Sequence, residues 1–430
     1  MTNNETSSSR RDFLTSSLRT SGALMATAAA LRSSPATAQN IVAAGFSTDI
    51  SGEDYWQMVR GQFSFAETAV PMNAANLCPS FRAVSDSVAW FTADIDRDSS
   101  FGNRAKFSPL REEARTSVAA QLNVSVDEIA LVRNTSEANN IVSNGLVMET
   151  GGEVLLWDQN HPTNNVAWDV RAARSGIRVR RVSTPVQASS IEVLLEAFTS
   201  QFTGRTKVLA ITHLSNISGV RLPIAELTEA AHDKGIYVHV DGAQTWGSMA
   251  LDLRALRVDS FTASAHKWYM GPKEVGLLYV RQDRVDSIWP SVVAPGWGNG
   301  AETSLVGARK FESLGQRDDA ALAGMGVAAT IHDQIGPQRI ESRITALSMR
   351  LKQEITELGL TLVTPMDVAM SHGVVILQAP PGGGGEISQR LYAEHGIAGS
   401  AAGGVRLSPT IYNTQEHIDR AIQAIRSLMT

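Results

Sequence analysis

Two short segments place a carboxylate and a lysine where both can meet one ligand. They are residues 239–244 (HVDGAQ) and residues 264–268 (SAHKW). Each lies at the C-terminal end of a predicted strand, and open α/β sheets bind their ligands outside the carboxyl ends of the strands. The 26 positions from Asp241 to Lys267 leave room for one crossover helix. We therefore expect both side chains to reach the same crevice.

This pair of residue types suits the chemistry of pyridoxal 5'-phosphate (PLP). A lysine amine forms a Schiff base with the cofactor, and a carboxylate keeps the pyridine nitrogen protonated so that the ring accepts electrons. Burial and neighbouring charge favour the nucleophilic amine of Lys267. Once a substrate amine has displaced it, that amine is free to move a proton at the substrate α-carbon.

The two motifs together resemble those of the class V aminotransferases, which are PLP enzymes of fold type I. The resemblance runs from about Asn73 to Leu428 and is closest to the isopenicillin N epimerase-like and cysteine desulfurase-like branches, of which we favour the first. It implies that Asp241 pairs with the pyridine nitrogen and that Gln244 hydrogen-bonds the ring hydroxyl oxygen. It further implies that Ser264 and His266 contact the phosphate.

Further cofactor candidates lie outside these motifs. Thr135 and Ser136 open a predicted helix whose free N–H groups and dipole suit a phosphate, although such a pair is more often a plain N-cap. His161 matches the family position where a ring stacks on the cofactor; the alternative is a surface histidine in a loop. Asn216 matches a family asparagine near the ring, and its segment is equally typical of a turn after a strand.

Arg406 stands where the family places an arginine that binds the substrate carboxylate, for which a planar guanidinium is suited. The alternative is a surface ion pair at a strand edge. Asn76 either meets the substrate or makes the turn before Pro79. The chain departs from the family at Gln316, where a threonine often reaches a phosphate in the partner subunit. Gln316 can still donate through its amide, and the adjacent Arg317 is a second candidate for that contact.

Cys78 is the only cysteine in the chain, so neither an intrachain disulfide nor a zinc cluster of cysteines can form. The cysteine desulfurase-like branch carries sulfur on a cysteine in a loop late in the chain, where this sequence has none. We therefore expect Cys78 to be a buried structural residue, and we expect no sulfur transfer from cysteine and no metal site.

Strand and helix patterns alternate for about 200 residues, which is typical of βα units that build a mostly parallel sheet. Together with the resemblance, this predicts an α/β protein of PLP fold type I, with a large doubly wound sheet of seven-stranded type and a small α+β C-terminal domain. The glycines at 382–385 are expected to form a surface turn. Strands are predicted at 70–73, 129–132, 153–157, 178–182, 208–212, 236–240, 260–264 and 275–280. Helices are predicted at 111–122, from 134, at 223–234, at 319–356 with a break at 336–337, and at 416–428.

The first 38 residues resemble a twin-arginine signal peptide. Arg10 and Arg11 precede Phe13 and Leu14, an apolar stretch follows at 22–31, and small residues end at Ala38. The apolar stretch is shorter than the roughly 20 residues that span a bilayer, so we expect no stable membrane insertion. The alternative is a disordered tail with a chance arginine pair. We predict a signal at 1–38, an N-terminal segment at 39–72, a large PLP-binding domain at 73–300 and a small domain at 301–430. Recognition by the twin-arginine export machinery would make the mature enzyme periplasmic or extracytoplasmic.

Composition and charge narrow the function further. A net charge of −5 without a basic block gives no support for a nucleic-acid partner, and no G-x-G-x-x-G follows the first strand. The favoured hypothesis is an exported PLP enzyme that acts on an amino-acid-like or peptide-bound amine by transamination, epimerisation or lyase chemistry through an external aldimine. Alternatives are a non-catalytic binding protein of the same fold, or a tailoring enzyme of a secreted peptide metabolite such as a siderophore. A homodimer is expected because this fold type usually completes its phosphate pocket at the subunit boundary.

Overall fold

A computed structural model of the protein describes residues 50–429, with the exception of residues 67, 186 and 295–304. The predicted signal peptide, its cleavage site and most of the Gly-rich segment at 294–301 therefore lie outside the described residues. All described residues belong to one compact unit, residues 46–430. Among them, no helix is both long and apolar enough to cross a membrane.

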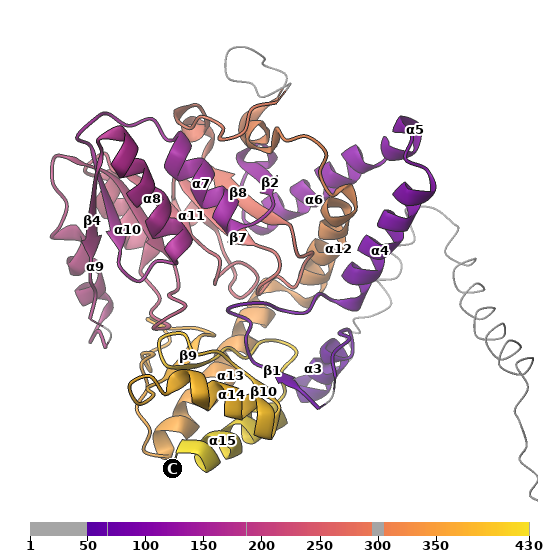
Figure 1. The fold of residues 1–430 in the computed structure, drawn as a ribbon, viewed down its shortest axis with the longest axis vertical. Helices are drawn as coiled ribbons and strands as arrows, with labels where there is room; N and C mark the ends of the chain where they lie inside the picture. The colour runs from indigo at the N-terminus through magenta and orange to yellow at the C-terminus, as the bar shows by residue number, and fades with distance from the viewer. Residues whose placement is uncertain (1–49, 67, 186, 295–304, 430) are drawn as a thin grey trace, which may run out of the picture. The chain divides into compact units, whose positions relative to one another are not determined.

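A seven-stranded sheet forms the centre of this unit, in the order β2-β8-β7-β6-β5-β3-β4 (Figure 1). The pairs β4/β3, β3/β5, β5/β6 and β6/β7 are parallel, whereas β8 runs antiparallel to both its neighbours. This confirms the predicted mostly parallel sheet. Its strands are β2 (Ile129–Val132), β3 (Glu153–Trp157), β4 (Arg178–Val182), β5 (Thr206–Thr212), β6 (Tyr237–Asp241), β7 (Ser260–Ser264) and β8 (Gly276–Val280).

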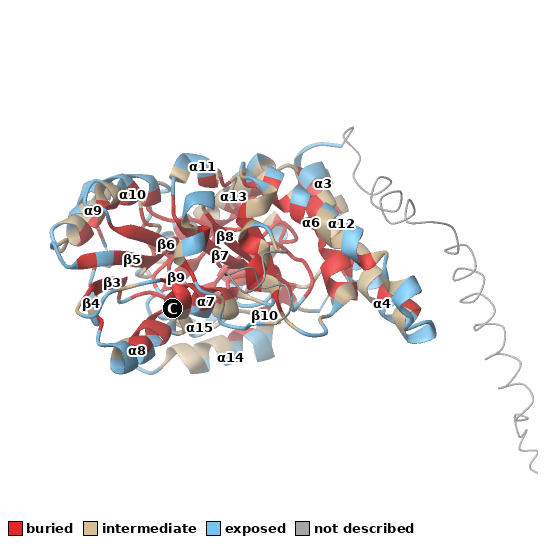
Figure 2. Cartoon of the chain, turned by 90° about the horizontal axis from the view of Figure 1, so that it is seen from above, coloured by how far each residue is buried: buried red, intermediate tan, exposed pale blue. Residues whose placement is uncertain are grey.

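Helices cover both faces of the sheet, so both sides of its inner strands are buried, including the polar residues that alternate with apolar ones in β6 and β7. Every residue of β6, β7 and β8 is buried (Figure 2). The helices of the unit are α3 (Gly52–Arg60), α4 (Arg82–Arg97), α5 (Phe101–Arg104), α6 (Phe107–Gln121), η1 (Val126–Glu128), α7 (Thr135–Gly145), α8 (Pro162–Ser175), α9 (Ile191–Thr199), α10 (Ile224–His232), α11 (Leu253–Leu256), η2 (Gln282–Ser287), η3 (Gly307–Glu312), α12 (Asp319–Ile335), α13 (Pro337–Glu357), α14 (Gly384–His395) and α15 (Gln415–Met429).

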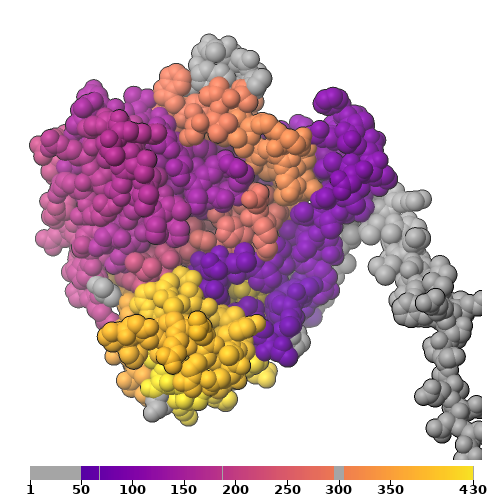
Figure 3. Space-filling view, viewed as in Figure 1, coloured from indigo at the N-terminus to yellow at the C-terminus, as the bar shows by residue number. Residues whose placement is uncertain are grey.

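The C-terminal part has a hydrophobic core of its own. Two small sheets border it: β9 (Val375–Leu377) pairs antiparallel with β11 (Val405–Leu407), and β1 (Val70–Pro71) pairs parallel with β10 (Ile397–Ala398). The core joins side chains of β1 to side chains of α13 and α15. Figure 3 shows these indigo N-terminal residues against the yellow C-terminal part. Residues before the large sheet therefore help to build the small α+β part.

The segment after the Gly-rich stretch packs on the large sheet rather than on this second core. η3 lies against β2, and α12 packs along α4 and α6. The predicted boundary at residues 300 and 301 stays a prediction, and these contacts favour a later one, near Gly336.

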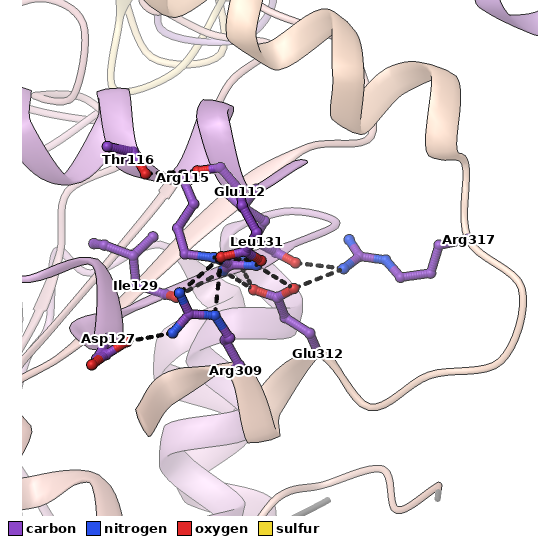
Figure 4. A network of polar contacts seen from close by, with 9 residues as sticks. All are labelled: Glu112, Arg115, Thr116, Asp127, Ile129, Leu131, Arg309, Glu312 and Arg317. Atoms are coloured by element: carbon purple, nitrogen blue, oxygen red, sulfur yellow. Dashed lines mark hydrogen bonds and ion pairs between the residues drawn. The ribbon is translucent and has the colours of Figure 1, made fainter. Parts of the chain in front are cut away.

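An ion-pair network covers the outer edge of β2, the last strand of the sheet (Figure 4). The Glu312 carboxylate accepts from the Leu131 amide at 2.6 Å, and Arg317 donates to the Leu131 carbonyl at 2.6 Å. Arg115 donates to the Ile129 carbonyl at 2.9 Å and pairs with Glu312. Side chains thus satisfy the backbone groups that an exposed edge strand would offer to another chain.

Several predicted elements have other bounds in the structure: the strand expected at 70–73 is only Val70–Pro71, for example. The helix expected at 111–122 begins four residues earlier, at Phe107. The glycines at 382–385 do not all form a turn, because Gly384 opens α14. A Cβ added to Gly384 would lie 3.0 Å from the Gly404 carbonyl oxygen. Close backbone packing therefore explains this glycine better than turn geometry does.

Candidate active site

Asp241 and Lys267 lie at the carboxyl ends of neighbouring parallel strands, as predicted. Asp241 ends β6 and pairs in register with Thr262 of β7, while Lys267 follows three residues after β7. The short helix α11 lies in the crossover between these strands. The Asp241 side chain is buried, with its carboxylate accepting from the Ala243 amide at 3.0 Å and from Asn139 Nδ2 at 3.0 Å.

The charges of the site act on Lys267. Burial lowers the pKa of Lys267, Asp241 opposes that shift and Arg406 adds to it. Burial likewise lowers the pKa of His161; Lys267 and Arg406 add to the shift and Asp241 opposes it. The structure therefore brings together four predicted site residues from distant parts of the chain. A lysine amine with a lowered pKa is a better nucleophile near neutral pH.

Three of the predicted phosphate contacts surround the start of α7. The Thr135 amide donates to Ser264 Oγ at 2.8 Å, and the two hydroxyl groups lie 2.7 Å apart. His266 follows Ser264 by two residues, and burial together with Lys267 lowers its pKa to about 4. His266 Nδ1 is buried and has no hydrogen-bond partner within the described part of the chain. Ser136 lines a cavity of about 420 Å³ beside the same helix start.

His161 is held by the loop that follows β3. It is the N-cap residue of α8, and its Nδ1 accepts from the Thr163 amide at 3.3 Å. The preceding residue, Asn160, ties this loop to β5: its Oδ1 accepts from the Thr212 amide at 2.7 Å, and its Nδ2 donates to the Ala210 carbonyl at 2.8 Å. These contacts fix the backbone of His161 beside the ends of β5 and β6.

Arg406 is presented by β11 of the C-terminal part and is 4% exposed. Its guanidinium donates to Asn73 Oδ1 at 3.0 Å and to the backbone carbonyl of Asn216 at 3.0 Å. Asn216 therefore contacts this site through its backbone. Asn76 is exposed in the turn after β1, and it is Asn73 whose side chain binds Arg406. Burial lowers the pKa of Arg406 to about 10, so the group is charged at neutral pH.

Gln244 is buried, and hydrogen bonds to both its amide oxygen and its amide nitrogen fix its orientation. Its Oε1 accepts from the Trp268 indole at 2.8 Å, and its Nε2 donates to the Ala75 carbonyl at 2.9 Å. The second hydrogen of this Nε2 group is available to donate to an oxygen atom of the cofactor ring.

The two residues proposed for a partner-subunit phosphate have other contacts. Gln316 is exposed and its Oε1 accepts from Arg104 at 2.6 Å. Arg317 points into the network on β2, where it donates to the Leu131 carbonyl (Figure 4). Arg317 therefore already has a hydrogen-bond partner within its own chain.

Three side chains that hydrogen-bond predicted site residues were missed from the sequence, and a fourth, Asn160, holds the loop of His161. The three are Asn73, Asn139 and Trp268. Only Asn139 left a sequence signal, because it lies one helical turn after Thr135 and so shares its face.

Comparison with known proteins identifies the family. The model of the family "Aminotransferase class-V" matches residues 96–421. The chain belongs to the class V aminotransferases. Isopenicillin N epimerase of Streptomyces clavuligerus is 28% identical over 390 residues, which cover 87% of this chain and 98% of that protein. A cysteine desulfurase of Enterobacter sp. (strain 638) is 28% identical over 357 residues, covering 75% and 84%.

Solved structures share the fold of this chain. A structure of C-DES with glycine covalently linked to the PLP cofactor has a TM-score of 0.79 at 23% identity, covering 86% of this chain and 99% of that chain. A cysteine desulfurase from Escherichia coli has a TM-score of 0.76 at 22% identity, covering 88% and 99%. The class V family is PLP-dependent and has fold type I, so the predicted fold and cofactor class are confirmed.

The residues of this chain fit PLP. The Thr135 and Ser264 hydroxyls, the start of α7 and the unpartnered Nδ1 of His266 offer donors to a phosphate. Asp241 lies on the sheet side of the site and Lys267 on the loop that follows the neighbouring strand. The hydrogen-bond donors complement the negatively charged phosphate of the cofactor, and the Asp241 carboxylate complements its protonated ring nitrogen.

Proposed function

We propose that the protein holds PLP on Lys267 and acts on the α-carbon of an amino acid or a peptide-bound amino acid whose carboxylate binds Arg406. The observation that carries this proposal is an arrangement of four residues. Asp241 and Lys267 lie at and just beyond the carboxyl ends of the neighbouring strands β6 and β7, His161 lies in the loop after β3, and Arg406 donates to the loop after β5. Bound PLP would withdraw electrons from the α-carbon of the substrate.

Each residue has a task that its surroundings support. Arg406 binds the substrate carboxylate, because Asn73 and Asn216 hold its guanidinium with neutral oxygen atoms and leave its charge uncompensated. Lys267, with its lowered pKa, carries the cofactor and then moves a proton at the α-carbon. His161, whose pKa is lowered by burial, would lie over the ring of bound PLP and exclude water there. Gln244 would donate to the ring hydroxyl oxygen, and Asp241 would meet the ring nitrogen.

Proton transfer at the α-carbon, as in epimerisation or transamination, is favoured over sulfur transfer. Relatives of both kinds exist, isopenicillin N epimerases and cysteine desulfurases. The chain has one cysteine, Cys78, and it is fully buried. Burial raises the pKa of its thiol to about 12, so the nucleophilic thiolate is scarce at neutral pH. A lyase acting on another bond remains a second candidate, and a non-catalytic PLP-binding protein a third.

An absorbance spectrum of the purified protein tests the cofactor site. We expect a band at roughly 410 to 430 nm that borohydride removes and that Lys267→Ala lacks. Lys234→Ala, which removes an exposed lysine, is the matched control and should keep the band. Proton NMR in D₂O should then show loss of the α-hydrogen signal of an accepted amino acid. A protein that stays colourless with added PLP would refute the proposal, and a coloured protein that exchanges no α-hydrogen would indicate the non-catalytic alternative.

We also propose that two chains associate beside the phosphate end of the site. Exposed apolar side chains gather there: Val147 and Trp289 flank a backbone pairing between Leu146 and Ile288, and Val292 and Val293 follow. Val292 also lines the cavity that contains Ser136. Light scattering should give the mass of a dimer, and Val293→Glu should shift it toward the monomer. A monomeric wild-type protein would refute this assembly.

Export through the twin-arginine machinery is the final part of the proposal, and residues 1–38 support it by sequence alone. Fractionation of cells that produce the full chain should place it outside the cytoplasm. Replacement of both Arg10 and Arg11 by lysine should retain it inside, whereas Arg19→Lys should not. Equal distribution of the double variant and the wild type would contradict export by this route.

A further inference from the structure

A chain of buried polar side chains continues from Asp241 into the protein interior. Asn139 of α7, His239 of β6, and Thr262 and Ser260 of β7 are each 0% exposed, and Asp241 is 1% exposed. Asn139 Nδ2 lies 3.0 Å from Asp241 Oδ2. Buried polar groups are costly unless they are hydrogen-bonded, so each contact of this chain matters for the geometry of the next.

The Asp241 carboxylate, at one end of this series of buried side chains, determines which group donates in each of the hydrogen bonds that follow. The Asp241 carboxylate only accepts, so the Asn139 amide nitrogen donates to it and the Asn139 Oδ1 faces the other way. That oxygen accepts from the Thr262 hydroxyl at 2.7 Å and from His239 Nε2 at 3.1 Å. His239 therefore carries its proton on Nε2, and its Nδ1 accepts from the Ser260 hydroxyl at 2.8 Å.

The state of His239 agrees with this assignment. Burial lowers its pKa to about 3, so the imidazole is neutral at any pH at which the enzyme would work. A neutral imidazole has one donor nitrogen and one acceptor nitrogen, and both are used here. The amide of Asn139 cannot rotate without placing its oxygen against the Asp241 carboxylate and its N–H groups against two donors.

We propose that Asn139, oriented by His239 and Thr262, is a positioning residue that fixes the Asp241 carboxylate toward the ring nitrogen of bound PLP. With Oδ2 held by Asn139 and Oδ1 held by the Ala243 amide, the plane of the carboxylate is set from both sides. The inference rests on the proposed function, in which Asp241 meets that nitrogen. It adds an assignment for His239, the first residue of the HVDGAQ motif, and for Asn139 and Thr262, which lie outside both cofactor motifs.

The orientation of Asp241 should affect the pKa of the nitrogen that joins PLP to Lys267 in a predictable direction. A well-oriented carboxylate keeps a proton, and hence a positive charge, on the ring nitrogen. That charge lowers the pKa of the nitrogen that joins PLP to Lys267, because like charges disfavour one another. Loss of the Asn139 contact should therefore raise the pH at which the visible absorption band titrates.

The experiment is a pH titration of that band in the holoenzyme. Asn139→Leu has a similar volume and removes the donor to Asp241; we expect its midpoint to rise by about one pH unit and its PLP dissociation constant to rise about tenfold. Asn144→Leu, which makes the same change on a less buried position of α7, is the matched control and should leave both values unchanged. Thermal denaturation of each holoenzyme checks folding.

A second pair of variants keeps the inference testable if Asn139→Leu does not fold. Thr262→Val removes one of the two donors to Asn139 and should raise the midpoint by a smaller amount, whereas Thr262→Ser keeps the hydroxyl and should restore the wild-type value. Midpoints that do not move in Asn139→Leu or Thr262→Val, in a protein that binds PLP through Lys267, would overturn the inference and leave the proposed function intact. A wild-type protein without the band would overturn both.

Discussion

Replacement of Arg406 by leucine should abolish selection for a substrate carboxylate without abolishing PLP binding. The guanidinium is buried at the boundary between β11 and the loop that contains Asn216, and its Nε has no hydrogen-bond partner among the described residues. Its fork can still donate to a carboxylate. Each hydrogen bond to a charged group contributes about 1.5 to 3 kcal/mol. Two such bonds correspond to about 3 to 6 kcal/mol, or roughly 10² to 10⁴ in the dissociation constant of the substrate.

The assay compares an amino acid with its carboxamide. Binding is followed by the change in the visible spectrum when the substrate amine displaces Lys267 from PLP. The wild type should bind the carboxylate form far more tightly, and Arg406→Leu should bind both forms about equally. Arg406→Lys keeps the charge but loses the fork, so its preference should be intermediate. Arg390→Leu, at an exposed position, is the control.

The pH dependence supplies an independent check. Burial lowers the pKa of Arg406 to about 10, so its charge is present below that value and is lost as the pH rises through it. Affinity for the carboxylate relative to the carboxamide should therefore fall above about pH 10 in the wild type and stay flat in Arg406→Leu. If Arg406→Leu keeps the wild-type ratio between the two ligands, Arg406 does not bind the carboxylate.

Two further predictions concern stability. Glu312→Gln should lower the free energy of unfolding by about 3 kcal/mol in urea titrations, because it removes the buried one of the two carboxylates that pair with Arg115 and leaves the more exposed Glu112. Glu394→Gln, in an exposed pair, should lower it by less than about 1 kcal/mol. Equal losses in the two variants would contradict the role of the β2 network. Gly242→Ala should lower the melting temperature by several degrees, since its Cβ would collide with the Phe261 ring and overpacking costs about 1 to 3 kcal/mol; an unchanged melting temperature would show that the ring moves aside freely.

The sheet and the two cofactor motifs could be predicted from the sequence because both are local patterns. Short strand patterns marked the inner strands; Asp241 ends one of them and Lys267 follows another by three residues. The contacts of Arg406 could not be predicted, because Asn73 lies 333 positions away and pairs with it only once β1 and β11 have joined the C-terminal core. The turn predicted from the glycines at 382–385 was partly wrong for a related reason. Gly384 is explained by its close packing against the backbone of residue 404, which is distant in sequence, rather than by a local turn.

The surroundings of Arg406 differ from those of the ion-paired buried arginines. Arg171 also donates only to backbone carbonyls, but the charge of Arg406 acts on Lys267 and His161 of the candidate site. Arg115 is paired with Glu312, and Arg343 is paired with Glu53 at 2.7 Å. Arg406 has only carbonyl-type oxygens as partners, and within the described part of the chain no carboxylate lies at ion-pair distance from it. A buried cation without an anion is costly, and a ligand that brings the anion recovers that cost on binding. A substrate carboxylate would meet this need beside Lys267, and a ligand without a negative charge would not.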